Sequence, residues 1–130
     1  MAQEVIAIIC DCDGTLCPDT TDKLVRELGL DSAQFWGRDV DGLVEDGWDH
    51  TLAHLNNLLA STRDRLNDPF TLSRLQTVGG GVKFYPGALD FVERLRVKLS
   101  GNPEYREAGV TVEWYIVSSG IEDILSATPL

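Results

Sequence analysis

Two aspartates follow a short apolar segment near the beginning of the chain, and their spacing is suited to acid–base or metal-assisted chemistry. The stretch VIAIICDCDGT places Asp11 and Asp13 directly after six apolar residues. If extended geometry continues through Cys12, side-chain alternation sends both carboxylates to the same side. Carboxylates this close repel each other, so a divalent cation or a shared proton is needed to hold them at neutral pH. Gly14 permits a sharp departure from the strand, and Thr15 adds a hydroxyl and a backbone donor.

Two other interpretations of this stretch were weighed. A calcium-binding EF-hand loop needs a glycine at its sixth position and a late glutamate, whereas here Gly14 follows the second aspartate immediately. The remaining alternative is a polar turn that only ends a strand. Few turns need two acids after so apolar a segment, which favours a functional site.

The segment that presents these acids is predicted to be a buried strand. Residues 5–10 are uninterrupted, apolar and rich in β-branched side chains, which is typical of a parallel strand covered on both faces. Residues 110–117 form a second such segment. A helix predicted from the apolar spacing over 89–99 leads into it, so a right-handed crossover between parallel strands is expected.

The residues between the two strands are mostly helical in pattern. A short helix carrying Leu24, Val25 and Leu28 is expected to be capped by Thr21 or Asp22 and to end at Gly29. A longer helix is expected over 48–66 and a further short helix over 70–77, with leucine stripes forming the core of a small helical unit. Three glycines are expected to interrupt any helix between them: Gly37, Gly42 and Gly47. The triple glycine in 78–81 is predicted to be a flexible hinge.

Composition limits the partners of the chain. The 130 residues are 43% hydrophobic and carry a net charge of −10, which disfavours binding to nucleic acid or an anionic membrane but permits a small phosphorylated substrate held by a metal. The three cysteines are too few for a disulfide framework, so a reducing cytoplasm is expected. Zinc binding by Cys10, Cys12 and Cys17 is a weak interpretation, because no second ligand pair follows.

The motifs and their order resemble the haloacid dehalogenase superfamily of hydrolases. IAIICDCDGTL is similar to the first signature of that family, and WYIVSSG, at 114–120, is similar to the second. The resemblance implies an α/β fold in which an incomplete Rossmann-like parallel sheet core, residues 1–16 and 82–130, carries an inserted helical cap, residues 17–81. It covers nearly the whole chain.

The same resemblance implies roles for individual residues. Asp11 would be the nucleophile that forms an aspartyl-phosphate, and Asp13 would be the general acid and then the general base. An aspartate two places after the nucleophile, as Asp13 is here, is the form found in phosphatases of the family. Mg²⁺ would bind through the Asp11 carboxylate and the backbone carbonyl of Asp13. Phosphate contacts would come from Gly14, Thr15, Ser118, Ser119 and Gly120.

Several of these residues have simpler interpretations. The serines at 118 and 119 have an alternative interpretation as a helix cap without a ligand, and this interpretation and phosphate binding can coexist. His50 and His54 have the spacing of a zinc-binding helix, but Thr51 stands where a metalloprotease has glutamate, so they are predicted to be ordinary helix-face residues. The tryptophans at 36 and 48 are predicted to lie in the core of the cap. Residues 17–20 and part of the cap are expected to shape the substrate pocket.

The residues after Ser118 lack two parts of the family's machinery. They contain no lysine, and Glu122 and Asp123 lie at the start of an expected helix rather than at the end of a strand. The sequence therefore predicts an Mg²⁺-dependent phosphatase, or the N-terminal portion of one with little activity alone. The alternative is a non-catalytic binding or assembly module that pairs with a second copy or with a further core segment through its uncovered sheet edge.

Overall fold

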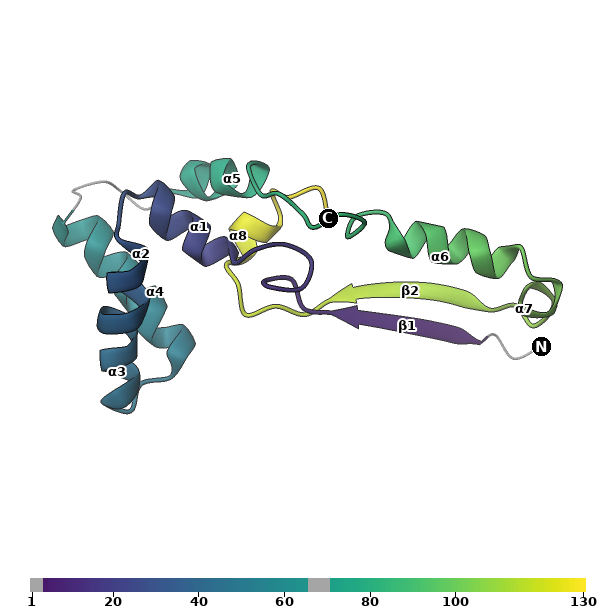
Figure 1. Ribbon diagram of the computed structural model, residues 1–130, viewed down its shortest axis with the longest axis horizontal. Coiled ribbons are helices and arrows are strands. Elements are labelled where there is room, and N and C mark those ends of the chain that lie inside the picture. Colours follow the sequence, from purple (N-terminus) through teal and green to yellow (C-terminus); the bar gives the residue numbers. More distant parts are fainter. Residues whose placement is uncertain (1–3, 66–70) are drawn as a thin grey trace. The chain divides into compact units, whose positions relative to one another are not determined.

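The computed structural model describes residues 4–65 and 71–130 and combines helices with a two-stranded parallel sheet (Figure 1). The chain divides into two units. The strand unit contains the described residues up to Pro18, together with Lys83–Ser118 and Leu130. The helical unit contains Asp19–Val82 and Ser119–Pro129. The α/β character predicted from the sequence is confirmed at this level.

The sheet of the strand unit pairs the two segments that the sequence predicts. Strand β1 (Val5–Cys10) lies parallel to β2 (Thr111–Ile116), in a register that runs from Val5 opposite Thr111 to Cys10 opposite Ile116. Helices α6 (Phe91–Ser100) and α7 (Pro103–Glu107) precede β2 along the chain. The predicted strand order and the helix before β2 are therefore confirmed, with β2 one residue shorter at each end than expected.

One face of the sheet packs against α6. In this register, side-chain alternation places Ile8, Val112 and Trp114 on the same face. The rings of Phe91 and Trp114 meet edge to face, with centroids 5.5 Å apart. The Arg96 guanidinium donates a hydrogen bond of 3.2 Å to the Val112 carbonyl. These contacts fix α6 to β2.

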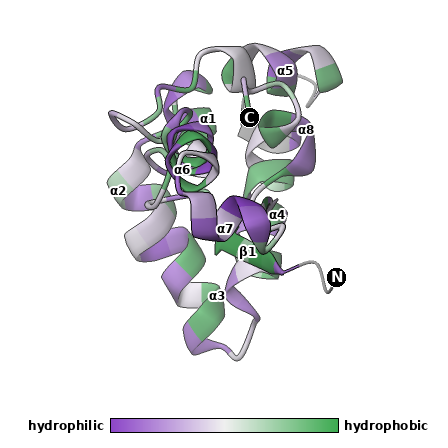
Figure 2. Cartoon of the chain, turned by 90° about the vertical axis from the view of Figure 1, so that its right-hand side faces the viewer, coloured by the Kyte–Doolittle hydropathy of each residue, from purple (hydrophilic) through white to green (hydrophobic). Residues whose placement is uncertain are grey.

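The opposite face of the sheet is exposed, and here the prediction of a strand buried on both faces is wrong. Ile9 is 67% exposed and Tyr115 49%, and Val117, which follows β2, is 65% exposed. Figure 2 shows the hydrophobic colouring of β1. The apolar sequence of β1 favours a strand, but burial requires a covering layer. Helix α6 packs against β2, and Ile6 of β1, on the same face, is still 41% exposed.

The helical unit begins with a capped helix. Helix α1 (Thr20–Glu27) starts after Asp19, whose carboxylate accepts a 2.7 Å hydrogen bond from the Asp22 amide. The predicted caps at Thr21 or Asp22 are therefore wrong, because both residues lie inside the helix. The predicted end at Gly29 is confirmed, since this residue has a φ of +73° and follows the last turn.

Two of the three glycines expected to break helices lie inside them. Helices α2 (Ser32–Gln34), η1 (Phe35–Val40) and α3 (Asp41–Glu45) follow one another directly, with η1 wound more widely as a π-helix. Gly37 and Gly42 fit this run in helical conformation. Only Gly47, with a φ of +94°, interrupts the chain as predicted.

The later helices differ from prediction at their ends. Helix α4 (His50–Ala60) is followed by η2 (Ser61–Arg65), while residue 66 of the predicted helix lies outside the described residues. Helix α5 (Leu72–Gly80) replaces the helix predicted at 70–77, and residue 70 is also outside the described part. The predicted hinge at 78–81 is wrong for Val78, Gly79 and Gly80, because these residues form the last turn of α5.

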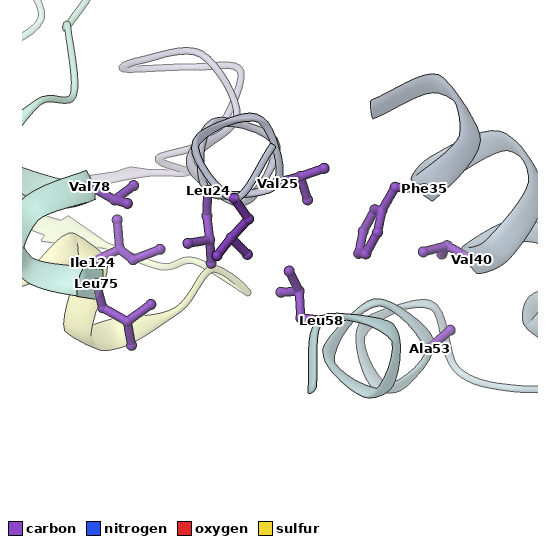
Figure 3. Close-up of a cluster of buried hydrophobic side chains, with 10 residues drawn as sticks. Leu24, Val25, Phe35, Val40, Ala53, Leu58, Leu75, Val78 and Ile124 are labelled. Atoms are coloured by element: carbon purple, nitrogen blue, oxygen red, sulfur yellow. The ribbon is translucent and has the colours of Figure 1, made fainter. Parts of the chain in front are cut away.

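The core of the helical unit joins α1, α4, α5 and the short helix α8 (Glu122–Leu125) (Figure 3). Residues 119–129, which the sequence analysis grouped with the strands, pack here through the fully buried Ile124. Only part of the predicted leucine stripe is buried, because Leu58 is enclosed whereas Leu52 and Leu59 are exposed. The buried members of this core are Leu24, Val25, Leu28, Phe35, Val40, Ala53, Leu58, Leu75, Val78 and Ile124.

Candidate functional site

The predicted site lies where both strands end. The Val117 amide donates a 2.9 Å hydrogen bond to the Cys10 carbonyl, which extends the parallel ladder one step beyond the strands. Asp11 and Ser118 follow these paired residues directly. Because parallel strands finish at the same sheet edge, the structure brings the ends of the two predicted signatures to one edge of the strand unit.

The loop after β1 is closed by its own backbone. The Cys12 carbonyl accepts hydrogen bonds from the amides of Thr15, Leu16 and Cys17, at 3.2, 2.8 and 3.3 Å. The Gly14 amide donates to the Cys17 carbonyl at 2.7 Å, and Gly14 has a φ of +75°, which disfavours residues with a Cβ. The loop from 12 to 17 is therefore a tight turn with a defined backbone.

Within this loop the two predicted catalytic aspartates have different surroundings. Asp11 is exposed, and its Oδ1 accepts a 2.8 Å hydrogen bond from the Cys12 amide. Asp13 is half-buried and forms an isolated bridge with Cys17. Strand β1 ends at Cys10, so the extended geometry that would send both carboxylates to the same side does not continue through Cys12.

The predicted phosphate-binding amides are partly engaged elsewhere. The backbone N–H groups of Gly14 and Thr15 donate within the loop, which leaves the exposed Thr15 side chain as the group that can reach a ligand. Ser118 is half-buried in the strand unit, whereas Ser119 and Gly120 belong to the helical unit.

The helix expected directly after Ser118 begins later than predicted. Helix α8 starts at Glu122, and Ile121 occupies the N-cap position with no side-chain capping bond. Neither Ser118 nor Ser119 therefore caps this helix, which excludes the simple capping interpretation. Their amides lie before the first helical turn.

Beside the aspartates lie the thiols of Cys12 and Cys17, whose proximity the sequence did not predict. Cys12 and Cys17 are both 0% exposed, and their Sγ atoms are 3.7 Å apart. Together with an Asp13 carboxylate oxygen, they form a group whose ligand atoms all lie within 4.8 Å of one another. Burial raises the pKa of the Cys12 thiol, and the nearby charges of Asp13 and Asp11 add to this shift. The signal in the sequence was the placement of both cysteines around DGTL.

The histidines lie in the helical unit and form a ring cluster with Trp36. His50 is exposed as predicted for a helix face, but His54 is only 6% exposed and contacts Trp36 edge to face at 5.7 Å. Trp36 is half-buried, and its Nε1 donates a 2.9 Å hydrogen bond to Asp22. Trp48 is 44% exposed, so its predicted place in the core is wrong.

Comparison of the chain with protein-family models, curated proteins and solved structures gave no match. Among the residues that the structure describes, no helix combines the length and apolar character needed to span a membrane.

Proposed function

We propose that the chain carries the nucleophile and the acid–base residue of an Mg²⁺-dependent phosphohydrolase of the haloacid dehalogenase type. A Rossmann-like core with an inserted helical cap is part of the same proposal. The observation that carries it is the closed loop after β1, which holds Asp11 and Asp13 at the sheet edge where Ser118 follows β2. An open parallel sheet binds its ligands at this edge.

Asp11 is suited to act as the nucleophile. It is exposed, and the Cys12 amide donates a hydrogen bond to Oδ1, so Oδ2 would be the attacking atom. In the first step Oδ2 forms a bond to phosphorus while the bond from phosphorus to the leaving alcohol oxygen breaks. The product is an aspartyl-phosphate on Asp11.

Asp13 is suited to move the proton in both steps. Its half-buried carboxyl would donate a proton to the leaving oxygen, since an alkoxide leaves poorly without one. The resulting carboxylate would then remove a proton from the water that attacks the aspartyl-phosphate. This second step restores the Asp11 carboxylate and returns the proton to Asp13, so the cycle closes.

The phosphoryl oxygens need hydrogen-bond donors. The hydroxyls of Ser118 and Thr15, both in the strand unit, would supply them. The Gly14 amide maintains the loop instead, because it donates to Cys17.

The oxygen groups of this loop fit Mg²⁺, which prefers hard oxygen ligands and retains several waters. The Asp11 carboxylate and the Asp13 backbone carbonyl would hold it. When bound, the ion screens the negative charge of the phosphoryl group from the attacking carboxylate.

The test is turnover of a small aryl phosphate ester with Mg²⁺. We expect Asp11→Asn to abolish turnover and Asp13→Asn to reduce it by about 10²–10⁴-fold. Asp46→Asn, an exposed aspartate of the helical unit, is the matched control and should leave the rate unchanged. Acid quenching followed by mass spectrometry should find a phosphoryl group on Asp11. Full turnover by Asp11→Asn, or no phosphoryl group on Asp11 in a chain that turns the ester over, would refute the proposal.

A second candidate function is assembly through the sheet. The exposed apolar residues Ile9, Tyr115 and Val117 favour it, because one face of the sheet remains without a covering layer among the described residues. A second copy or a further sheet segment would cover them. Light scattering during gel filtration should then show a dimer or a complex, and a monomer at micromolar concentration together with full turnover would refute this alternative.

A further inference from the structure

The thiol pair beside the aspartates has the dimensions of a metal site. In a tetrahedral zinc site with Zn–S bonds of about 2.3 Å, two sulfur ligands lie about 3.8 Å apart. The Sγ atoms of Cys12 and Cys17 are 3.7 Å apart. A disulfide requires sulfurs about 2.0 Å apart, so both residues are reduced thiols that are in hydrogen-bond contact, at a separation that zinc ligation also has.

A third ligand is already in place. An Asp13 carboxylate oxygen lies within 4.8 Å of both sulfur atoms. Two thiolates and one carboxylate form a donor set that suits Zn²⁺, whereas Mg²⁺ prefers oxygen ligands alone. The loop would thus distinguish the two ions, with Mg²⁺ at Asp11 and the Asp13 carbonyl, and zinc at the thiols.

We propose that Cys12, Asp13 and Cys17 form a binding site for Zn²⁺ with three protein ligands and a fourth position for water. Binding replaces the two thiol protons, which are released to solvent, and involves no oxidation. Three ligands with one open position are the composition of zinc sites that exchange their fourth ligand.

The backbone prepares this site before any metal arrives. Three amides donate to the Cys12 carbonyl, and this turn sets the separation of the two cysteines. Both thiols are enclosed, whereas Asp13 is half-buried, so the metal would enter and the water would lie on the Asp13 side. A preformed turn lowers the entropy lost when the metal binds.

Occupancy would also affect catalysis, and this part rests on the proposed function. The carboxylate that would transfer the proton in hydrolysis is the same one that would ligate zinc. Zinc binding should therefore inhibit turnover by withdrawing Asp13, even with Mg²⁺ present. If Cys12→Ser and Cys17→Ser abolish this inhibition by zinc, zinc binding at the thiols is the cause of the lost turnover.

The experiment uses Co²⁺ as a spectroscopic probe on the full chain, kept reduced with a phosphine. We expect a thiolate-to-cobalt charge-transfer band, displaced by Zn²⁺. Cys12→Ser and Cys17→Ser should each weaken binding at least about tenfold, as loss of a metal ligand does. Cys10→Ser is the matched control, because it changes a neighbouring thiol outside the group, and it should bind as the unmodified chain does.

The outcomes separate the two proposals. Absence of the band, equal weakening by Cys10→Ser, or a full band in the double variant of Cys12 and Cys17 would overturn the zinc site. Circular dichroism of the variants establishes that they are folded, and Asp13→Asn, which leaves both thiols, should weaken binding while retaining the band. A band together with full turnover by Asp11→Asn would support the zinc site and refute the proposed function, and turnover that is abolished by Asp11→Asn without a band would do the reverse.

Discussion

Replacing Gly79 with alanine adds a methyl group where α5 packs against α8 in the helical unit. Gly79 lies in the last turn of α5 and is buried. A Cβ built at this position would lie 2.2 Å from the carbonyl oxygen of Ile124 and 2.8 Å from the Cβ of Ala127. The nearer atom belongs to the backbone, so no side-chain rotation can relieve the overlap.

Two opposing effects determine the size of the change. Glycine to alanine inside a helix stabilises by about 1 kcal/mol, because alanine loses less backbone entropy. Against this, overpacking costs about 1–3 kcal/mol, and displacing α8 exposes Ile124, whose burial contributes about 1.5–3 kcal/mol. We expect a net loss of about 1.5–5 kcal/mol for Gly79→Ala.

The neighbouring glycine provides a matched control. A Cβ at Gly80 meets no atom within 4 Å, and this residue is also helical. Gly80→Ala should therefore raise the free energy of unfolding by about 0.5–1 kcal/mol. Urea unfolding followed by circular dichroism measures both variants under the same conditions. If Gly79→Ala is as stable as Gly80→Ala, the close packing of α5 against α8 is refuted.

Three further changes test the helical unit. His54 is buried, and burial and the proximity of His50 lower its pKa below the usual 6.5, although Asp19 and Asp49 oppose this shift. The folded state thus favours the neutral ring. The stability that this ring contributes is complete above pH 6.5 and is lost as the pH falls toward the lowered pKa, so His54→Leu should remove this pH dependence of folding. Asp22→Asn, which weakens acceptance from Arg26 and Trp36, should cost about 1 kcal/mol by urea unfolding. Asp49→Ala removes the cap of α4 and should also cost about 1 kcal/mol in the same assay.

Each of these changes has its own control. Glu27→Gln alters an exposed pair with Lys23 and should change stability by less than about 0.5 kcal/mol. An equally small effect of Asp22→Asn would contradict a stabilising role for the hydrogen bonds that Asp22 accepts from Arg26 and Trp36. Asp46→Ala removes an aspartate that caps no helix N-terminus and should be nearly neutral. If His54→Leu retains the full loss of stability at low pH, groups other than this ring cause it.

Local patterns predicted much of the secondary structure. The apolar segments gave both strands, and Gly29 ended α1 because a positive φ stops a helix without strain. Parallel pairing followed from the intervening helices, since parallel strands need a long crossover. The position of the two aspartates at the end of β1 also followed from local sequence, because they come directly after its apolar residues.

Errors arose where a residue serves packing rather than propensity. Gly79 and Gly80 were interpreted as a hinge because glycine weakens helices, but the space beside Ile124 admits only glycine at position 79. Gly37 remained inside a helix because the neighbouring π-helical turns continue through it. Trp48 was expected in a core, but its apolar ring alone could not show that it lies in an exposed segment before α4.

The sequence by itself determined the types of group available at the candidate site: two carboxylates, a glycine turn and three thiols next to an apolar strand. Only the tertiary structure decided which of them meet. The turn whose amides donate to the Cys12 carbonyl brings the Sγ atoms of Cys12 and Cys17 to 3.7 Å from each other, although the two residues are five positions apart in the sequence. The positive φ of Gly14 and the three amides that donate to the Cys12 carbonyl set that distance. Residue spacing alone predicts neither the φ angle nor these hydrogen bonds.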